Sequence, residues 1–295
     1  MMPIRAQRIQ GLVFCATAVA VVACAELVQR LDPQTELVAM AIPIVILGVP
    51  HGVLDTVFAR HQYNVRTVKD WVGFTAAYFI PAALVVALWQ LAPQLFLAGF
   101  LMISIVHFSG DPSPGTPVLS RVFYGGAIIV LPTILYAPEV TQLFSFLVGP
   151  DTAMQTVAAL LYLKWPWLVG LVLAAIARMQ SDWLSGLEIA ALGLLATLAP
   201  PLVAFTVFFC IMHSARHILR TMNYFDQISL PRMVFAAATP MSVTVILSVA
   251  AWNSFGDTAI DVRVSQLVFV GLAALTVPHM AIVERVRLFG WIRKS

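Results

Sequence analysis

Apolar blocks of about 16 to 24 residues recur along the whole chain, and short polar or proline-marked breaks separate them. A helix needs about 20 apolar residues to cross the hydrocarbon of a bilayer. Spanning backbone must satisfy its own hydrogen bonds, and the alternation typical of strands is absent, so a helical bundle is expected. Only 11% of the 295 residues are charged, against about a quarter in soluble domains. The sequence predicts an all-α, polytopic membrane protein with a single integral membrane domain, residues 1–295.

Ten transmembrane spans are predicted from the apolar blocks. They cover approximately residues 10–28, 37–58, 71–91, 94–109, 119–137, 153–176, 184–199, 202–220, 233–252 and 264–283. The first follows Arg5 and Arg8, as a signal peptide would, but it is long for one and no small-residue cleavage site follows, so we interpret it as a span. The longest connection, around residues 138–152, is predicted to be a loop.

The basic residues orient this bundle. With ten spans and a cytoplasmic N-terminus, fourteen of the 17 Lys and Arg residues lie on the cytoplasmic side, two lie outside, and Lys164 falls within a span. Cytoplasmic loops carry an excess of Lys and Arg, so both termini are predicted to be cytoplasmic in a multi-pass protein of the cell membrane. The formal net charge of +3 therefore gives no indication of nucleic-acid binding.

Histidines are concentrated within the spans. His51, His107, His213, His217 and His279 lie on the second, fourth, eighth and tenth predicted helices, which all run from outside to inside. At about 1.5 Å per residue, each lies roughly 3 to 12 Å from the cytoplasmic end of its helix. Although a single intramembrane histidine is often only an interhelical hydrogen-bond partner, five in one layer favour a functional site.

Several imidazoles in one layer indicate metal binding, because imidazole is the commonest protein metal ligand. His213 and His217, at i and i+4, share one helix face and can grip one ion. A closed zinc site and a ferrous iron site with open positions for oxygen both remain compatible with this pattern. A bis-histidine haem is less compatible, since one helix cannot supply opposite axial ligands.

Two of the histidine motifs also carry an aspartate four residues later, in HGVLD (51–55) and HFSGD (107–111). Asp55 could orient a metal ligand through a hydrogen bond, or ligate a second metal. Asp111, which PSPGTP follows, is interpreted as a solvated residue at the helix end.

Other polar and aromatic residues have plainer interpretations. His61 is predicted to be a solvated loop residue, Arg216 to mark the inner helix end, and the three cysteines to be reduced core residues. Lys164 could form a Schiff base or snorkel to the interface, and Glu188 has the same ambiguity of depth. Six aromatic residues are conceivable walls of an apolar tunnel, although ordinary packing is the better explanation of each: Tyr78, Phe108, Trp165, Phe205, Phe208 and Phe209.

Four motifs in order, GVPHGVLD (48–55), HFSGD (107–111), HSARH (213–217) and TVPHMAIVE (276–284), make the sequence resemble the Brp/Blh family of membrane β-carotene 15,15′-dioxygenases. The resemblance covers approximately residues 40–285. It implies cleavage of the central double bond of all-trans-β-carotene by dioxygen, giving two retinal molecules. It also implies Fe²⁺ held by His51, His107, His213 and His217. His279 matches a further motif of the family, and whether it ligates the iron, hydrogen-bonds an oxygen species or only supports the site from outside, as Asp55 could, stays open.

The same resemblance implies that the partners of the chain are lipid-dissolved β-carotene, dioxygen and membrane lipids, with a functional link to a retinal-binding opsin. Two other functions remain open from the residues alone. One is a divalent-metal transporter that uses the histidine layer, which the apolar outer halves of these helices disfavour. The other is a di-metal membrane oxygenase that uses Asp55 and Asp111 and acts on another lipid.

Overall fold

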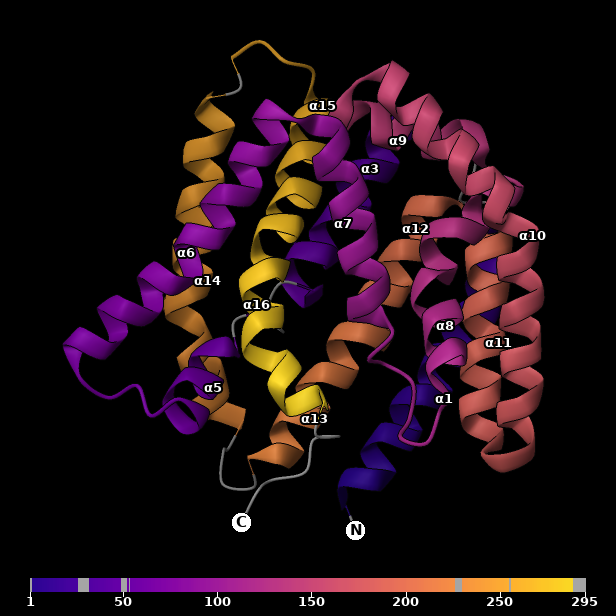
Figure 1. Cartoon of the computed structure of the whole chain (residues 1–295), viewed down its shortest axis with the longest axis horizontal. Coiled ribbons are helices and arrows are strands. Elements are labelled where there is room, and N and C mark those ends of the chain that lie inside the picture. The colour runs from indigo at the N-terminus through magenta and orange to yellow at the C-terminus, as the bar shows by residue number, and fades with distance from the viewer. Residues whose placement is uncertain are drawn as a thin grey trace.

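The computed structural model describes residues 2–25, 32–48, 52, 54–225, 230–254 and 256–288. Within these residues every regular element is a helix (Figure 1). The α-helices are α1 (Met2–Ala23), α3 (Pro33–Pro43), α5 (Asp55–Gln62), α6 (Val68–Leu91), α7 (Pro93–Phe108), α8 (Val118–Val130), α9 (Ala137–Val148), α10 (Pro150–Ser181), α11 (Trp183–Leu198), α12 (Pro201–Val207), α13 (Ala215–Tyr224), α14 (Leu230–Ser254), α15 (Ile260–Ser265) and α16 (Gly271–Leu288). A 3₁₀ turn, η2 (Leu131–Ile134), follows α8, and three π-helical segments occur: η1 (Ile44–Gly48), η3 (Phe208–Ser214) and η4 (Gln266–Val270). The all-helical prediction is confirmed.

Several of these helices suit a membrane. Five are long and apolar enough to cross one: Arg5–Ala23, Val68–Leu91, Pro150–Ser181, Pro201–Tyr224 and Ile260–Val283. The segment Val118–Ile134 passes only together with α9, and the two are bent by 112°. α7 and α11 are apolar but only 16 residues long. Every predicted block contains helix, while the number of ten spans remains a prediction.

The prediction of a loop around residues 138–152 is wrong. Most of this stretch forms α9, and α10 begins at Pro150. Both helices have proline in their first turn, where its missing N–H costs nothing. Gly149 joins them with φ of 82°, a conformation that glycine adopts without strain. Apolar residues therefore continue through a tight turn rather than through a loop.

The helices pack around a buried core. α10 packs against α8 and α11, α11 packs against α1, and α16 packs against α6. Residues of α1, α8, α10, α11 and η3 form the largest buried cluster, which includes Phe14, Tyr124, Leu192 and Phe208. α6 is apolar, yet only 6% of its most apolar stretch is buried within the protein, as expected for a helix that faces lipid.

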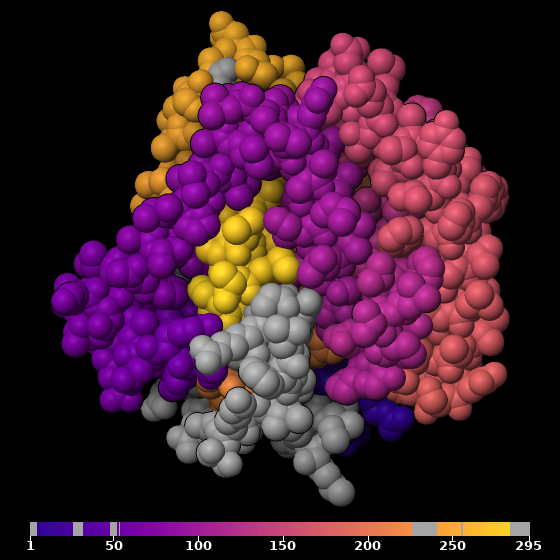
Figure 2. Space-filling model, in the orientation of Figure 1, coloured from indigo at the N-terminus to yellow at the C-terminus, as the bar shows by residue number. Residues whose placement is uncertain are grey.

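Two features of the arrangement bear on function. α1 begins and α16 ends at the same end of the bundle (Figure 1). On the face shown in Figure 2, α6 and α7 diverge below their shared end, and side chains of α16 are visible in the hollow between them. The histidine-bearing helices α7, α13 and α16 all approach the lower end in Figure 1, so their histidines can meet there.

Candidate metal centre

Four described histidines form one continuous cluster of rings. His107 ends α7, His213 lies in η3, His217 in α13 and His279 in α16. The ring centroids of His107 and His213 are 4.5 Å apart, those of His107 and His279 are 5.3 Å apart, and those of His217 and His279 are 5.1 Å apart. The structure thus brings together these four predicted residues. His51 lies outside the described residues.

The first carboxylate at the cluster is Asp111, in the loop after α7. Both of its oxygens lie 3.0 Å from Nδ1 of His213. A carboxylate only accepts hydrogen bonds, so this contact places the imidazole proton on Nδ1. Nε2 of His213, which is buried, is then the nitrogen with the lone pair that a metal needs. Asp111 is only 4% exposed, so its interpretation as a solvated residue is wrong.

The second carboxylate is Asp55, the first residue of α5. Its Oδ1 lies 2.8 Å from Nδ1 of His279, and its Oδ2 accepts a hydrogen bond of 3.0 Å from the hydroxyl of Tyr78. Asp55 and His279 are both 2% exposed. This pair therefore repeats the arrangement of Asp111 and His213, and the rings of both histidines contact that of His107.

The aspartate of each HxxxD motif contacts a histidine that lies far along the chain. Asp111 contacts His213, 102 residues later, and Asp55 contacts His279, 224 residues later. Neither interaction is with the histidine of the same motif. The histidine of each motif is thus a predicted metal ligand, and the aspartate of each motif orients the imidazole of another histidine.

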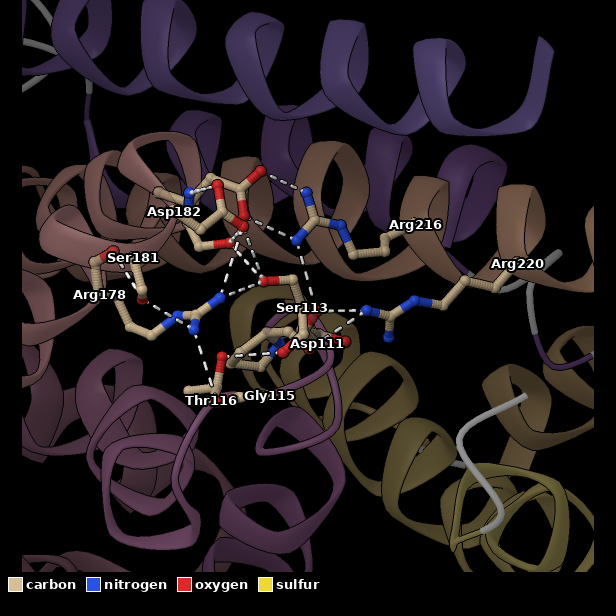
Figure 3. A network of polar contacts seen from close by, with 12 residues as sticks. Asp111, Ser113, Gly115, Thr116, Arg178, Ser181, Asp182, Arg216 and Arg220 are labelled. Carbon is tan, nitrogen blue, oxygen red and sulfur yellow. Dashed lines mark hydrogen bonds and ion pairs between the residues drawn. The ribbon is translucent and has the colours of Figure 1, made fainter. Parts of the chain in front are cut away.

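An arginine pair holds the loop that carries Asp111. The backbone carbonyl of Asp111 accepts hydrogen bonds from Arg220 at 2.7 Å and from Arg216 at 3.3 Å, and Figure 3 shows both guanidinium groups directed at this loop. Arg216 is 4% exposed and forms two hydrogen bonds with Glu188, of 2.8 and 2.6 Å. The plainer role predicted for Arg216, marking a helix end, is therefore wrong, and Glu188 is a buried ion-pair partner.

The other end of the same loop is held by α10 and the start of α11 (Figure 3). Arg178 donates to the hydroxyl of Ser113 at 3.1 Å, and Ser113 donates to Asp182 at 3.3 Å. Asp182 lies between the two helices, and hydrogen bonds from Ser185 hold its pKa below the usual value. The loop is thus fixed from both sides, which keeps Asp111 against His213.

Aromatic rings shield the cluster from water. The ring of Phe108 lies 4.9 Å from that of His213, and Phe209 stacks on His213 with centroids 5.6 Å apart. Phe208 and Phe205 continue this apolar wall. Trp165 is 57% exposed and lies on the outer surface of α10, so of the predicted tunnel aromatics it is the one placed away from the core.

Three further predicted residues lie apart from the cluster. His61 is exposed, as predicted, but it belongs to α5 rather than to a loop, and its ring contacts Phe225. Lys164 lies on α10, half-exposed beside Trp165. Cys24 is exposed, contrary to its predicted place in the core, whereas Cys15 and Cys210 are buried.

Three pairs of neighbouring rings have separations close to those of ligands of one metal. An imidazole nitrogen binds a metal at about 2.1 Å, so two neighbouring ligand rings have centroids roughly 4.5 to 5.2 Å apart. The centroid distances here are 4.5, 5.1 and 5.3 Å. Among the described residues, however, no group of three or more His, Cys, Asp and Glu side chains is arranged so as to hold an ion. A metal here requires a further donor or a rearrangement of these rings.

Sequence reasoning missed the hydrogen bond from Tyr78 to Asp55 and the ion pair of Arg216 with Glu188. For Tyr78 the sequence indicates only a conceivable tunnel wall. The signal for the ion pair is a charged residue of each sign within predicted spans, since such residues are costly in lipid unless they are paired.

These features define a class: a helical protein with several helices long and apolar enough to cross a membrane, and with a buried, carboxylate-oriented imidazole cluster. The model of the β-carotene 15,15′-dioxygenase family matches residues 42–286, so the chain belongs to this oxidoreductase family. It is 29% identical over 257 residues to β-carotene 15,15′-dioxygenase from uncultured marine bacterium 66A03, which covers 82% of this chain and 90% of that protein. No solved structure matches the chain.

Proposed function

We propose that the chain cleaves the central 15,15′ double bond of all-trans-β-carotene with dioxygen. The double bond breaks, each of its two carbons becomes an aldehyde carbon, and two retinal molecules result. The observation that carries this proposal is the buried imidazole cluster, in a chain whose family is named for this reaction. The retinal product motivates the proposed link to a retinal-binding opsin.

The proposed cofactor is Fe²⁺, held by His51, His107, His213 and His217. The donor set supports this choice, because neutral imidazoles leave the ion its charge and suit ferrous iron as well as zinc. When bound, the iron would supply a place for dioxygen to bind and be activated beside the substrate. Asp111 holds the proton of His213 on Nδ1, and Phe108 and Phe209 exclude water from the same imidazole.

The substrate is a hydrocarbon dissolved in the bilayer, so a lateral route spares it a passage through water. The divergence of α6 and α7, with α16 between them (Figure 2), supports entry from the lipid at this face. Recognition would then depend on the shape of an apolar passage, because β-carotene offers no hydrogen-bonding group. The proposed topology has ten spans in the cell membrane, with both termini cytoplasmic.

The contacts of the two aspartates disfavour a di-metal oxygenase. Asp55 and Asp111 each accept a hydrogen bond from a buried imidazole, and ligation of a second metal would have to compete with these contacts. The proposal is therefore one iron per chain.

The proposal is tested by expression in bacteria that produce β-carotene. Loss of pigment, retinal formation and bound iron are measured for the wild-type protein, His213→Ala and His217→Ala, with His61→Ala as a matched control outside the cluster. We expect retinal and one iron per chain for the wild type and the control, and loss of both for the two cluster variants. A folded wild-type protein that binds iron under air but forms no retinal would contradict the proposal.

A further inference from the structure

We propose that His279, oriented by Asp55, is itself a ligand of the proposed iron rather than a supporting residue outside its coordination sphere. The inference rests on the proposed function, because it concerns the same metal. It adds a ligand from α16 to those expected on α7 and on η3–α13.

The ring of His279 contacts two predicted ligands at once. Its centroid lies 5.3 Å from that of His107 and 5.1 Å from that of His217. These distances are similar to the 4.5 Å between the predicted ligands His107 and His213. A residue that only supported one ligand would be expected to contact that ligand alone, whereas His279 contacts two of them.

His279 and His213 make equivalent contacts with a carboxylate. Asp55 contacts Nδ1 of His279 at 2.8 Å, as Asp111 contacts Nδ1 of His213 at 3.0 Å. Metal-binding histidines almost always donate their second ring N–H to a carboxylate, carbonyl or water, and this contact fixes the nitrogen that faces the metal. A carboxylate on Nδ1 leaves Nε2 as the metal-facing nitrogen in both residues.

Asp55 is itself held in place by a hydrogen bond and by its position at the start of a helix. Its second oxygen accepts the hydroxyl proton of Tyr78 at 3.0 Å, and the carboxylate lies at the N-terminal end of α5, where the backbone N–H groups favour negative charge. Tyr78, Asp55 and His279 thus form a chain of hydrogen bonds from α6 to the cluster. Such a chain orients one particular imidazole, that of His279.

The decisive experiment measures metal binding separately from activity. The apoprotein in detergent is titrated anaerobically with Fe²⁺, and separately with Co²⁺, whose visible absorption depends on the number of ligands. The variants are His279→Ala, Asp55→Asn and Asp111→Asn, with His61→Ala as the control. Circular dichroism and monodispersity establish that each variant is folded.

We expect Asp55→Asn to weaken Fe²⁺ binding about 10- to 100-fold, as Asp111→Asn does. His279→Ala should weaken it at least as much and should change the Co²⁺ spectrum, while His61→Ala leaves both unchanged. A folded His279→Ala variant with wild-type Fe²⁺ affinity and Co²⁺ spectrum would overturn the inference. If His279→Ala does not fold, Asp55→Asn decides: wild-type affinity and spectrum in that variant overturn it as well.

The two proposals fail in different ways. A wild-type protein that binds no iron contradicts the proposed function and leaves no metal for His279 to bind. Iron binding that is lost in His213→Ala but retained in His279→Ala contradicts only the role of His279.

Discussion

At the scale of single residues, the buried charges of Arg216 and Glu188 stabilise one another. Arg216 and Glu188 are 4% and 5% exposed, and their paired hydrogen bonds match the planar guanidinium to the carboxylate. Gln10 accepts a further hydrogen bond of 3.0 Å from Arg216 Nε. Because Arg216 also donates to the Asp111 carbonyl, this pair connects the stability of the bundle to the placement of His213.

We expect Glu188→Gln to lower the free energy of unfolding by about 3 to 5 kcal/mol, because it leaves the charge of Arg216 buried without compensation. Denaturant-induced unfolding in detergent measures this loss. The control is the double variant Glu188→Leu with Arg216→Met, which removes both charges and should be much closer to the wild type. A loss below about 1 kcal/mol in Glu188→Gln would indicate that water compensates the arginine instead.

The membership of the cluster was predictable from residue types alone, because intramembrane histidines are costly and several of them in one layer are typical of a functional site. The orienting contacts were not predictable. Asp111 precedes PSPGTP, which is typical of a solvated loop, and it is long-range contacts such as those of Arg220 and Arg178 that hold this loop against the bundle. The pairing of Asp55 with His279 joins residues 224 positions apart, and local spacing contains no information about such a pair.

At the scale of elements, three π-helical segments lie near predicted histidines along the chain. η1 precedes His51 along the chain, η3 contains His213, and η4 precedes α16 with His279. π-helical turns are frequent at functional sites, because a wider turn re-aims the side chains near it. Hydropathy and the i, i+4 spacing predict one regular helix over residues 202–220, and the backbone departs from that regularity at the site.

The contact of α7 with α8 gives a prediction at the same scale. A Cβ at Gly125 would meet the backbone of α7, at the carbonyl of Ile105 and at the nitrogen of Ser109, the latter 2.7 Å away. Gly125→Ala should therefore displace the end of α7, which carries His107. We expect a loss of about 1 to 3 kcal/mol in unfolding free energy, measured by denaturation, together with weaker Fe²⁺ binding.

The matched control for this substitution is Gly99→Ala, in α7 itself, where a Cβ meets nothing within 4 Å. Alanine favours a helix over glycine by about 1 kcal/mol, so this variant should be neutral or stabilising. Equal behaviour of the two variants would show that α7 and α8 can separate without consequence for the site.

At the scale of the whole molecule, the apolar periodicity was enough to predict an all-helical membrane protein, because lipid leaves the backbone so few alternatives. It was not enough to predict how helices bend. α8–η2 and α9 meet at 112°, and either a broken span or a re-entrant loop satisfies the same hydropathy. A broken span and a re-entrant loop would have the same local composition. What distinguishes them is how α9 packs, and here it packs against α7 and α10.

Reporter fusions distinguish these topologies. With ten spans and a cytoplasmic N-terminus, alkaline phosphatase fused after Gly149 should be exported and active, whereas fusions after Asp182 and at the C-terminus should be inactive. A cytoplasmic reporter such as green fluorescent protein should show the reverse pattern. Inactive alkaline phosphatase after Gly149 would favour the re-entrant arrangement of α8 and α9 and contradict the ten-span topology.

The contacts of Asp111 with His213 and of Asp55 with His279 also set an order of events during biosynthesis. Both carboxylates lie in the first 111 residues, and both imidazoles that they orient lie after residue 212. A nascent chain that has inserted only its first half therefore contains both aspartates but neither of the histidines that they contact. The pair of Asp55 with His279 can form only after α16 has been inserted. Maturation of the centre would be a post-translational event, and a truncated product that lacks the last helix would remain incompletely assembled.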